Sequence, residues 1–146
     1  MSRLRFALVV GLTAACAAPE FQQVDLAADT TLPSQQTVRF SPVPPLQTPG
    51  DNNQVCLTPA PPFAIDDSLW GIRGPNGNVA WVRGVLIRPD GERDSLDSKT
   101  IWGDSTEHLC LMLRVGQAPS RTYTAVILTS TQSVPLRRVF WLSTSK

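Results

Sequence analysis

The stretch HLCLMLRVGQAPSRTYTAVILTS, residues 108–130, decides the fold that the sequence predicts. Aliphatic side chains occupy alternate positions in its first part: Leu109, Leu111, Leu113 and Val115. Successive side chains of a β-strand point to opposite faces, so this spacing gives one wholly aliphatic face. The residues between them are mixed in character. We therefore expect a strand with one face in a hydrophobic core.

A second strand is predicted over residues 122–130, where β-branched and aromatic residues dominate. One face of this strand carries Tyr123, Ala125, Ile127 and Thr129, and the other carries Thr124, Val126 and Leu128. The segment 116–121 between the two runs is short and rich in turn-forming residues. The stretch therefore predicts two strands joined by a polar corner.

The pattern Leu113-x5-Pro119-x3-Tyr123-x-Ala-x-Ile resembles the E–F corner of fibronectin type III and other immunoglobulin-like domains. In that corner a Tyr at the start of the second strand returns its hydroxyl to the backbone. The resemblance implies that Tyr123 is buried and bonded to backbone within 115–121. The alternative is an ordinary β-hairpin that contains a tyrosine.

The remainder of residues 54–146 repeats the same rhythm of short apolar runs and turns. Strong turn signals lie at 74–78 and 89–92, and the longest apolar run is 79–88. On that run we expect Trp81 to share a core face with Val85 and Ile87. About seven short strands predict an all-β, immunoglobulin-like (fibronectin type III-like) antiparallel sandwich over 54–146. Residues 67–70 and 79–82 also resemble the B–C region of a type III domain.

The N-terminus predicts export. Arg3 and Arg5 precede a short apolar run that ends in small residues before Cys16, which is typical of a signal peptide over 1–15. The ending LTAAC resembles a bacterial lipobox, although Thr13 stands where a larger aliphatic residue is usual. The resemblance implies acylation of Cys16, and Ala17 after it implies sorting to the outer membrane. The alternative is cleavage after Ala15 or Ala18, which leaves a soluble periplasmic or secreted protein.

Residues 16–53 are rich in proline and polar residues, without a sustained hydrophobic period. We expect a flexible, extended tether there, because such a composition buries too little apolar surface to offset its ordering entropy. One segment, 37–41, alternates and is a candidate edge strand.

Without Arg3 and Arg5 the chain has 11 basic and 12 acidic residues, a formal charge of −1. This balance argues against a nucleic-acid partner.

Two cysteines, Cys56 and Cys110, remain once Cys16 is set aside. In an exported chain they predict one disulfide. Cys110 is opposite in phase to Leu109 and Leu111, so we expect the bridge on an outer or edge face. The alternative is a pair of free buried thiols.

The sequence does not predict an enzyme. His108 is the only histidine, we expect it at a solvated strand end, and one histidine beside paired cysteines cannot build a structural zinc site. No Gly-x-Ser-x-Gly motif is present, and no metal or other cofactor is implied.

Two tryptophans, Trp102 and Trp141, are candidate binding residues, because exposed aromatic rings stack on sugars or anchor protein partners. We expect Trp141 to point outward, on the opposite face from Phe140 and Leu142.

The function predicted first is a non-enzymatic envelope lipoprotein, held on the membrane by its lipid, that presents its domain to a protein partner. The second is a carbohydrate- or peptidoglycan-binding module.

Overall fold

The computed structural model describes residues 22–102, 107–114 and 121–145, with the side chains of Ser98 and Trp102 left aside. These residues form β-strands, turns and bends, and no helix occurs among them. Every pair of named strands is antiparallel. The all-β, antiparallel class predicted from the sequence is confirmed.

The strands in chain order are β1 (Gln22–Leu32), β2 (Thr37–Phe40), β3 (Leu46–Gln47), β4 (Asn52–Pro59), β5 (Ala64–Asp66), β6 (Gly71–Arg73), β7 (Val79–Ala80), β8 (Val82–Ile87), β9 (Arg93–Trp102), β10 (His108–Leu113), β11 (Thr122–Tyr123), β12 (Ala125–Ser130) and β13 (Val134–Thr144).

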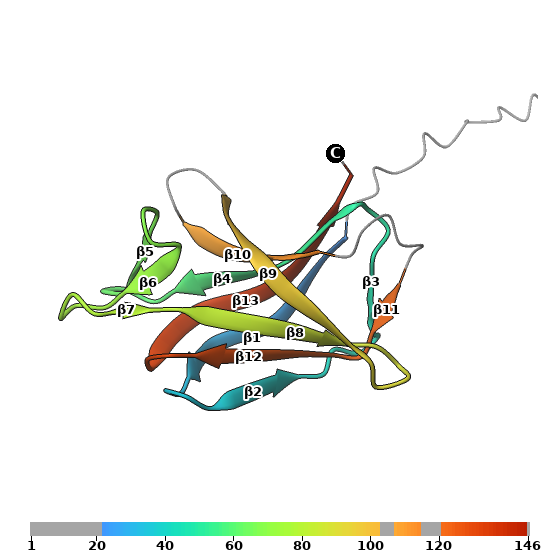
Figure 1. Cartoon of the computed structure of the whole chain (residues 1–146), viewed down its shortest axis with the longest axis horizontal. Coiled ribbons are helices and arrows are strands. Elements are labelled where there is room, and N and C mark those ends of the chain that lie inside the picture. Colours follow the sequence, from blue (N-terminus) through green and yellow to red (C-terminus); the bar gives the residue numbers. More distant parts are fainter. Residues whose placement is uncertain (1–21, 103–106, 115–120, 146) are drawn as a thin grey trace, which may run out of the picture.

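Eight strands form one sheet in the order β1-β13-β4-β10-β9-β8-β12-β2. Its two end strands, β1 and β2, are neighbours in the chain and come close at the turn between them (Figure 1). Gln35 in that turn donates its N–H to the carbonyl of Ser130 at 2.8 Å, which ties the turn to β12. The sheet is therefore nearly closed and barrel-like. This single order does not confirm the two separate sheets of an immunoglobulin-like sandwich.

Two smaller sheets complete the fold. β3 pairs with β11, and β5, β6 and β7 form a three-stranded sheet. The two lie at opposite ends of the barrel-like sheet (Figure 1).

The interior is filled by the alternating side chains that the sequence predicted for β10. Leu109 and Leu111 are fully buried in the main core and Leu113 packs against it. Val55 and Leu57 of β4 and Val126 and Leu128 of β12 join them. The second predicted strand is interrupted at Thr124, so that β11 and β12 belong to different sheets. This break lets Tyr123 enter the same core as Val126, which an unbroken alternation would not allow.

The prediction that Trp81 faces the core is wrong, and the burial pattern of β8 shows why. Ala80, Val82, Gly84 and Leu86 are buried, so the even-numbered positions face inward and Trp81 faces outward. A Cβ at Gly84 would lie 2.7 Å from Leu96 Cδ1 and 3.2 Å from Leu111 Cδ1. At this position the core therefore has room only for glycine. Because glycine has no apolar side chain, a pattern of hydrophobic residues does not predict that position 84 faces the core.

The tether predicted for 16–53 is wrong from residue 22 onward. β1 pairs with β13 from Gln22↔Ser143 to Leu32↔Val134, and Leu32 and Leu46 are fully buried. The segment alternates weakly because a β-bulge falls between Asp25 and Ala27, and Asp29 has φ 47°. The folded unit thus begins before residue 54. The edge strand predicted at 37–41 is confirmed as β2, which pairs with β12.

Among the described residues there is no helix with the length and apolar character needed to cross a membrane.

Candidate functional site

A carboxylate fixes the turn between β5 and β6. Asp66 Oδ1 accepts hydrogen bonds from the backbone N–H groups of Ser68 (3.1 Å) and Leu69 (3.0 Å) and from the Ser68 hydroxyl (2.7 Å). Its Oδ2 accepts from the guanidinium of Arg73, which also donates to the carbonyl of Gly77 at 2.8 Å. The bonds from Ser68 and Arg73 lower the pKa of Asp66 from 3.8 to about 2. The turn is therefore held in one conformation by an ionised side chain.

This turn presents large apolar side chains to solvent. Leu69 is 45% exposed and Trp70 is 43% exposed. Trp81, which lies between β7 and β8, is 44% exposed. Trp70 has φ 54°, a left-handed conformation that is unusual and costly for a bulky residue. Its backbone is thus held in a strained turn, and its ring stays on the surface. We call Leu69, Trp70 and Trp81 the aromatic patch.

Trp81 is anchored although it is exposed. Its indole Nε1 donates to the carbonyl of Leu69 at 3.3 Å, so the ring is tied to the turn that carries Trp70. Its backbone N–H donates to Thr131 Oγ1 at 2.9 Å, and the N–H of Thr131 donates back to the Trp81 carbonyl at 3.0 Å. These bonds link the three-stranded sheet to the end of β12. The patch is therefore preorganised and needs little ordering to meet a partner.

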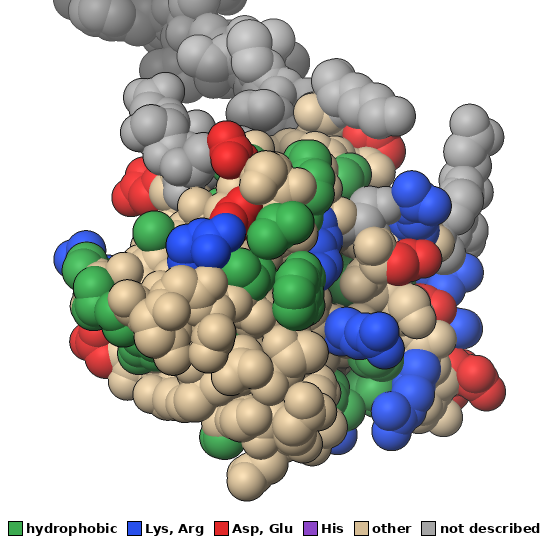
Figure 2. Space-filling model, turned by 60° about the vertical axis from the view of Figure 1, so that its left-hand side comes forward, with side chains coloured by type: hydrophobic (Ala, Val, Ile, Leu, Met, Phe, Trp, Pro, Cys, Tyr) green, Lys and Arg blue, Asp and Glu red, His purple; other side chains and the backbone are tan. Residues whose placement is uncertain are grey.

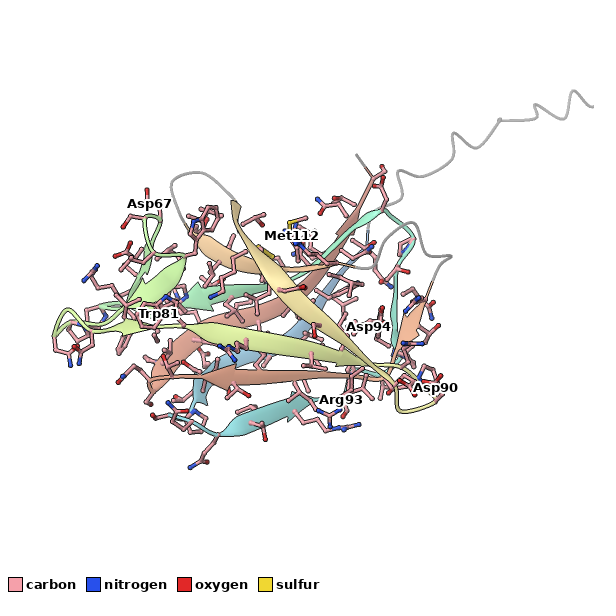
Figure 3. All side chains as sticks on the ribbon, in the orientation of Figure 1. Asp67, Trp81, Asp90, Arg93, Asp94 and Met112 are labelled. Atoms are coloured by element: carbon pink, nitrogen blue, oxygen red, sulfur yellow. A yellow bond between two sulfur atoms is a disulfide. The ribbon has the colours of Figure 1, made fainter. Side chains whose placement is uncertain are left out.

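The aromatic patch lies at the β5–β7 end of the molecule. Figure 2 brings that end forward and shows hydrophobic side chains gathered between acidic and basic ones. In Figure 3, Trp81 lies at this end and Asp67 lies on the turn above it. A small apolar centre with a charged rim is the arrangement found at protein–protein hot spots.

Trp141, one of the two tryptophans predicted as binding residues, is not at this patch. Trp141 is fully buried in the main core, and its indole Nε1 donates to the carbonyl of Gln47 at 3.1 Å, so the outward orientation predicted for it is wrong. β13 is buried on both faces, since Phe140 and Leu142 are also fully buried, and alternation could not tell which face was internal. The backbone of Trp102 belongs to β9, and its side chain lies outside the described residues.

Tyr123 is fully buried, as predicted, and its hydroxyl binds a carboxylate. It donates to Asp94 Oδ2 at 2.7 Å, across to β9. The predicted partner was the segment 115–121, of which 115–120 lie outside the described residues. The burial that the resemblance implied is confirmed, and the hydroxyl donates to a carboxylate of another strand. A bond to backbone within 115–121 stays a prediction.

Asp94 is the centre of a charged network at the other end of the barrel-like sheet (Figure 3). It accepts from Arg121 Nη1 at 2.8 Å and from Arg88 Nη2 at 3.2 Å, besides Tyr123. Burial raises the pKa of Asp94, but the bonds from Tyr123 and Arg121 and the charges of both arginines outweigh it and lower the pKa below 3.8. Burial and the bond to Asp94 raise the pKa of Tyr123. The network fastens β8, β9 and β11 and presents a fully engaged carboxylate.

The predicted disulfide is confirmed. Cys56 and Cys110 are directly paired on β4 and β10 and are bonded. With Phe140 and Leu142 they form a second hydrophobic cluster, separate from the main core. The bridge is therefore on the outer face of the sheet, as its phase predicted, although both cysteines are buried.

His108 belongs to the same outer face, and the solvated position predicted for it is wrong. It is 7% exposed, its Nδ1 lies 2.7 Å from Thr58 Oγ1, and its ring meets Phe140 edge-on at 5.2 Å. Burial lowers its pKa, the nearby Glu107 raises it and Arg138 lowers it further.

Within the described residues no group of three or more His, Cys, Asp or Glu side chains could hold a metal ion. Cys16 lies outside the described residues.

Leu69 and Trp70 are the binding candidates that the sequence prediction missed. The available signal was the sequence Asp66-Asp67-Ser68, since Asp and Ser favour turns in which the side chain bonds the backbone two residues on. Such a turn ends the strand and forces the apolar residues after it to the surface.

A comparison of this chain with protein-family models, with curated proteins and with solved structures found no match.

Proposed function

We propose that this chain is a non-enzymatic binding module of the cell envelope, anchored by an acyl group on Cys16, whose aromatic patch docks on a protein partner. The observation that carries the proposal is the exposure of Leu69, Trp70 and Trp81 on a turn fixed by Asp66. Tryptophan is enriched among residues that dominate protein–protein binding energy. Fixing such residues beforehand reduces the entropy lost on association.

The chemistry of the patch supports a protein partner over a glycan. Leu69 supplies aliphatic surface, and the Trp81 N–H is committed to the Leu69 carbonyl. Asp66 and Arg73 are committed to one another and to the turn backbone. Sugar hydroxyls need accessible donors and acceptors, whereas these groups are engaged within the chain. The patch therefore offers mainly apolar contact area.

The disulfide and the N-terminal sequence support an address outside the cytoplasm. Disulfides persist in oxidising compartments such as the periplasm. Lipid anchoring at Cys16, with Ala17 after it, favours the outer membrane, and a soluble periplasmic or secreted form is the alternative.

Two variants test the address. In the native cells, Cys16→Ala is expected to abolish partition of the protein into detergent and to release it or stall its processing. Cys56→Ala serves as the control for loss of a different cysteine and should still partition. An unchanged soluble mature protein in both the parent and Cys16→Ala contradicts the lipid anchor.

Proximity labelling from intact cells tests the patch. Trp70→Ser with Leu69→Ser is expected to remove the labelled protein partner, because it removes exposed apolar surface without touching the core. Val43→Ser is the matched control, since Val43 is 95% exposed and lies between β2 and β3, away from the β5–β7 end. Retention of every labelled partner by a folded double variant contradicts the proposal. Capture of the parent by isolated cell-wall glycan that is lost in the double variant assigns the patch to a glycan instead.

A further inference from the structure

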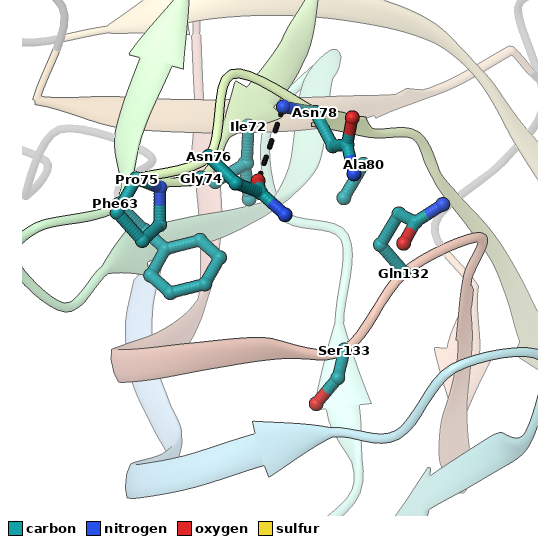
Figure 4. A pocket seen from close by; sticks show the side chains of 9 residues that line it. All are labelled: Phe63, Ile72, Gly74, Pro75, Asn76, Asn78, Ala80, Gln132 and Ser133. Atoms are coloured by element: carbon teal, nitrogen blue, oxygen red, sulfur yellow. Dashed lines mark hydrogen bonds between the residues drawn. The ribbon is translucent and has the colours of Figure 1, made fainter.

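A cavity of about 180 Å³ lies behind the three-stranded sheet, between the turn 74–78 and residues 132–133 that precede β13 (Figure 4). Ala80 lines this cavity, and alternation places the next residue, Trp81, on the opposite face. The cavity and the aromatic patch therefore lie on different faces of the same small sheet, and the cavity's chemistry is independent of the patch.

The floor of the cavity is apolar and rigid. Ile72 is fully buried in the main core and Ala80 is 2% exposed. Phe63 is half-buried, packs against the same core and forms one side of the cavity (Figure 4). An aromatic ring held in this way offers a flat apolar platform to a ligand.

The rim consists of neutral hydrogen-bonding groups. Three carboxamides line it, those of Asn76, Asn78 and Gln132, together with the hydroxyl of Ser133. Each carboxamide carries two N–H donors and one carbonyl acceptor. Asn76 Oδ1 accepts the backbone N–H of Asn78 at 3.2 Å, which fixes that amide and keeps its NH₂ group for other partners (Figure 4). None of the residues that line the cavity is ionisable.

These features limit the ligand. A charged group would lose its hydration without meeting an opposite charge, which is costly. A purely apolar ring would strip water from the amides without replacing their hydrogen bonds. A cavity of about 150 Å³ holds a benzene ring, so 180 Å³ has room for one six-membered ring. A pyranose meets all three conditions, since its C–H face packs on an aromatic ring and its hydroxyls both donate and accept.

We propose that this cavity binds one neutral pyranose residue, with its C–H face on Phe63 and its hydroxyls on Asn76, Asn78 and Gln132. The site is separate from the protein-docking patch. The module would thus contact a sugar and a protein from two faces of one small sheet.

NMR titration of the mature chain tests the site. The probes are glucose, galactose, mannose and N-acetylglucosamine, with glucuronate and glucosamine as charged counterparts, benzene as an apolar ring and a short neutral peptide. At least one neutral pyranose is expected to shift the side-chain amide signals of Asn76, Asn78 and Gln132 in a saturable way. Equal or stronger binding of the charged, apolar or peptide probes at these signals overturns the proposal, as does no saturable shift with any sugar.

Two variants then locate the sugar. Gln132→Leu removes an exposed amide and is expected to weaken binding roughly three- to tenfold, the effect of one hydrogen bond. Gln23→Leu, an exposed glutamine on β1, is the matched control and should bind as the parent does. Gly74→Ala adds a Cβ 3.1 Å from Phe63 Cε1 and 3.3 Å from Asn76 Oδ1, so it narrows the cavity and should reduce binding further.

Unchanged sugar affinity in both cavity variants, each with a folded spectrum, overturns the site. Leu69→Ser with Trp70→Ser should leave the sugar affinity unchanged. Failure of the protein-docking proposal is thereby distinguished from failure of this one.

Discussion

Trp141 and Trp81 each stand between two apolar residues in the sequence, yet Trp141 is fully buried and Trp81 is 44% exposed. β13 lies between β1 and β4 inside the sheet order, and Phe140 and Leu142 are buried on its second face. At Trp81 the chain passes from the small sheet to β8, and its neighbours Ala80 and Val82 are the buried ones. The neighbours of a tryptophan therefore do not decide its burial. The number of covered faces of its strand does.

The largest test of this comparison replaces each indole in turn. Trp141→Ala is expected to reduce the free energy of unfolding by about 3–5 kcal/mol, because it opens a cavity in the main core and leaves the Gln47 carbonyl without its N–H donor. Trp81→Ala should cost less, about 1–2 kcal/mol, because the residue is 44% exposed and the bond that its indole donates to the Leu69 carbonyl is lost. Chemical denaturation measures both. Similar losses in the two variants would refute the division into core and patch.

The disulfide extends the comparison to the outer face of β4 and β10. The two cysteines are 54 residues apart, so loop-closure entropy predicts that the bridge contributes about 4 kcal/mol. The double variant Cys56→Ala with Cys110→Ala should therefore unfold at clearly lower denaturant concentration than the oxidised parent. Adding reductant should weaken the parent and leave the double variant unchanged. Equal stability of parent and double variant would show that the outer-face cluster is held by Phe140 and Leu142 alone.

These cases show which strand faces could be predicted from the sequence and which could not. The alternation in β10 predicted its inner face because the opposite face is mixed, and the phase of Cys110 predicted an outer bridge. Alternation failed on β13, where both faces are apolar, and on β8, where Gly84 takes an inner position. β1 escaped prediction because its bulge breaks the period and its stability comes from pairing with β13, more than 100 residues away. The patch depends on hydrogen bonds of Asp66, which composition alone does not reveal.

Tyr123→Phe tests the bond that the buried phenol donates to Asp94. The variant keeps the ring in the core and removes the donor to Asp94, so we expect a loss of about 1–2 kcal/mol, as for a hydrogen bond to a charged group that keeps its other partners. The pKa of Asp94 is lowered in the folded state, so its stabilisation is present above pH 3.8 and is lost as the pH falls. Without the phenol that acid sensitivity should diminish. Unfolding of parent and variant at neutral and acidic pH measures both effects, and identical curves would mean that the two arginines suffice for Asp94.

The smallest expected effect concerns His108, which the outer face buries against Thr58 and Phe140. Burial lowers its pKa below 6.5, and the charges of Glu107 and Arg138 act in opposite directions. The unfolded chain therefore binds a proton at a higher pH than the folded chain does. Its contribution to stability is complete above pH 6.5 and declines as the pH falls toward the folded pKa.

Asp66 and Asp94 have lowered pKa values and act in a separate window below pH 3.8. Denaturation between about pH 7.5 and pH 5 thus isolates the histidine. His108→Gln keeps a hydrogen-bonding side chain beside Thr58 but does not titrate, so its stability should be flat across that range while the parent weakens slightly. A parent that gains stability on acidification would mean that the attraction of Glu107 outweighs burial.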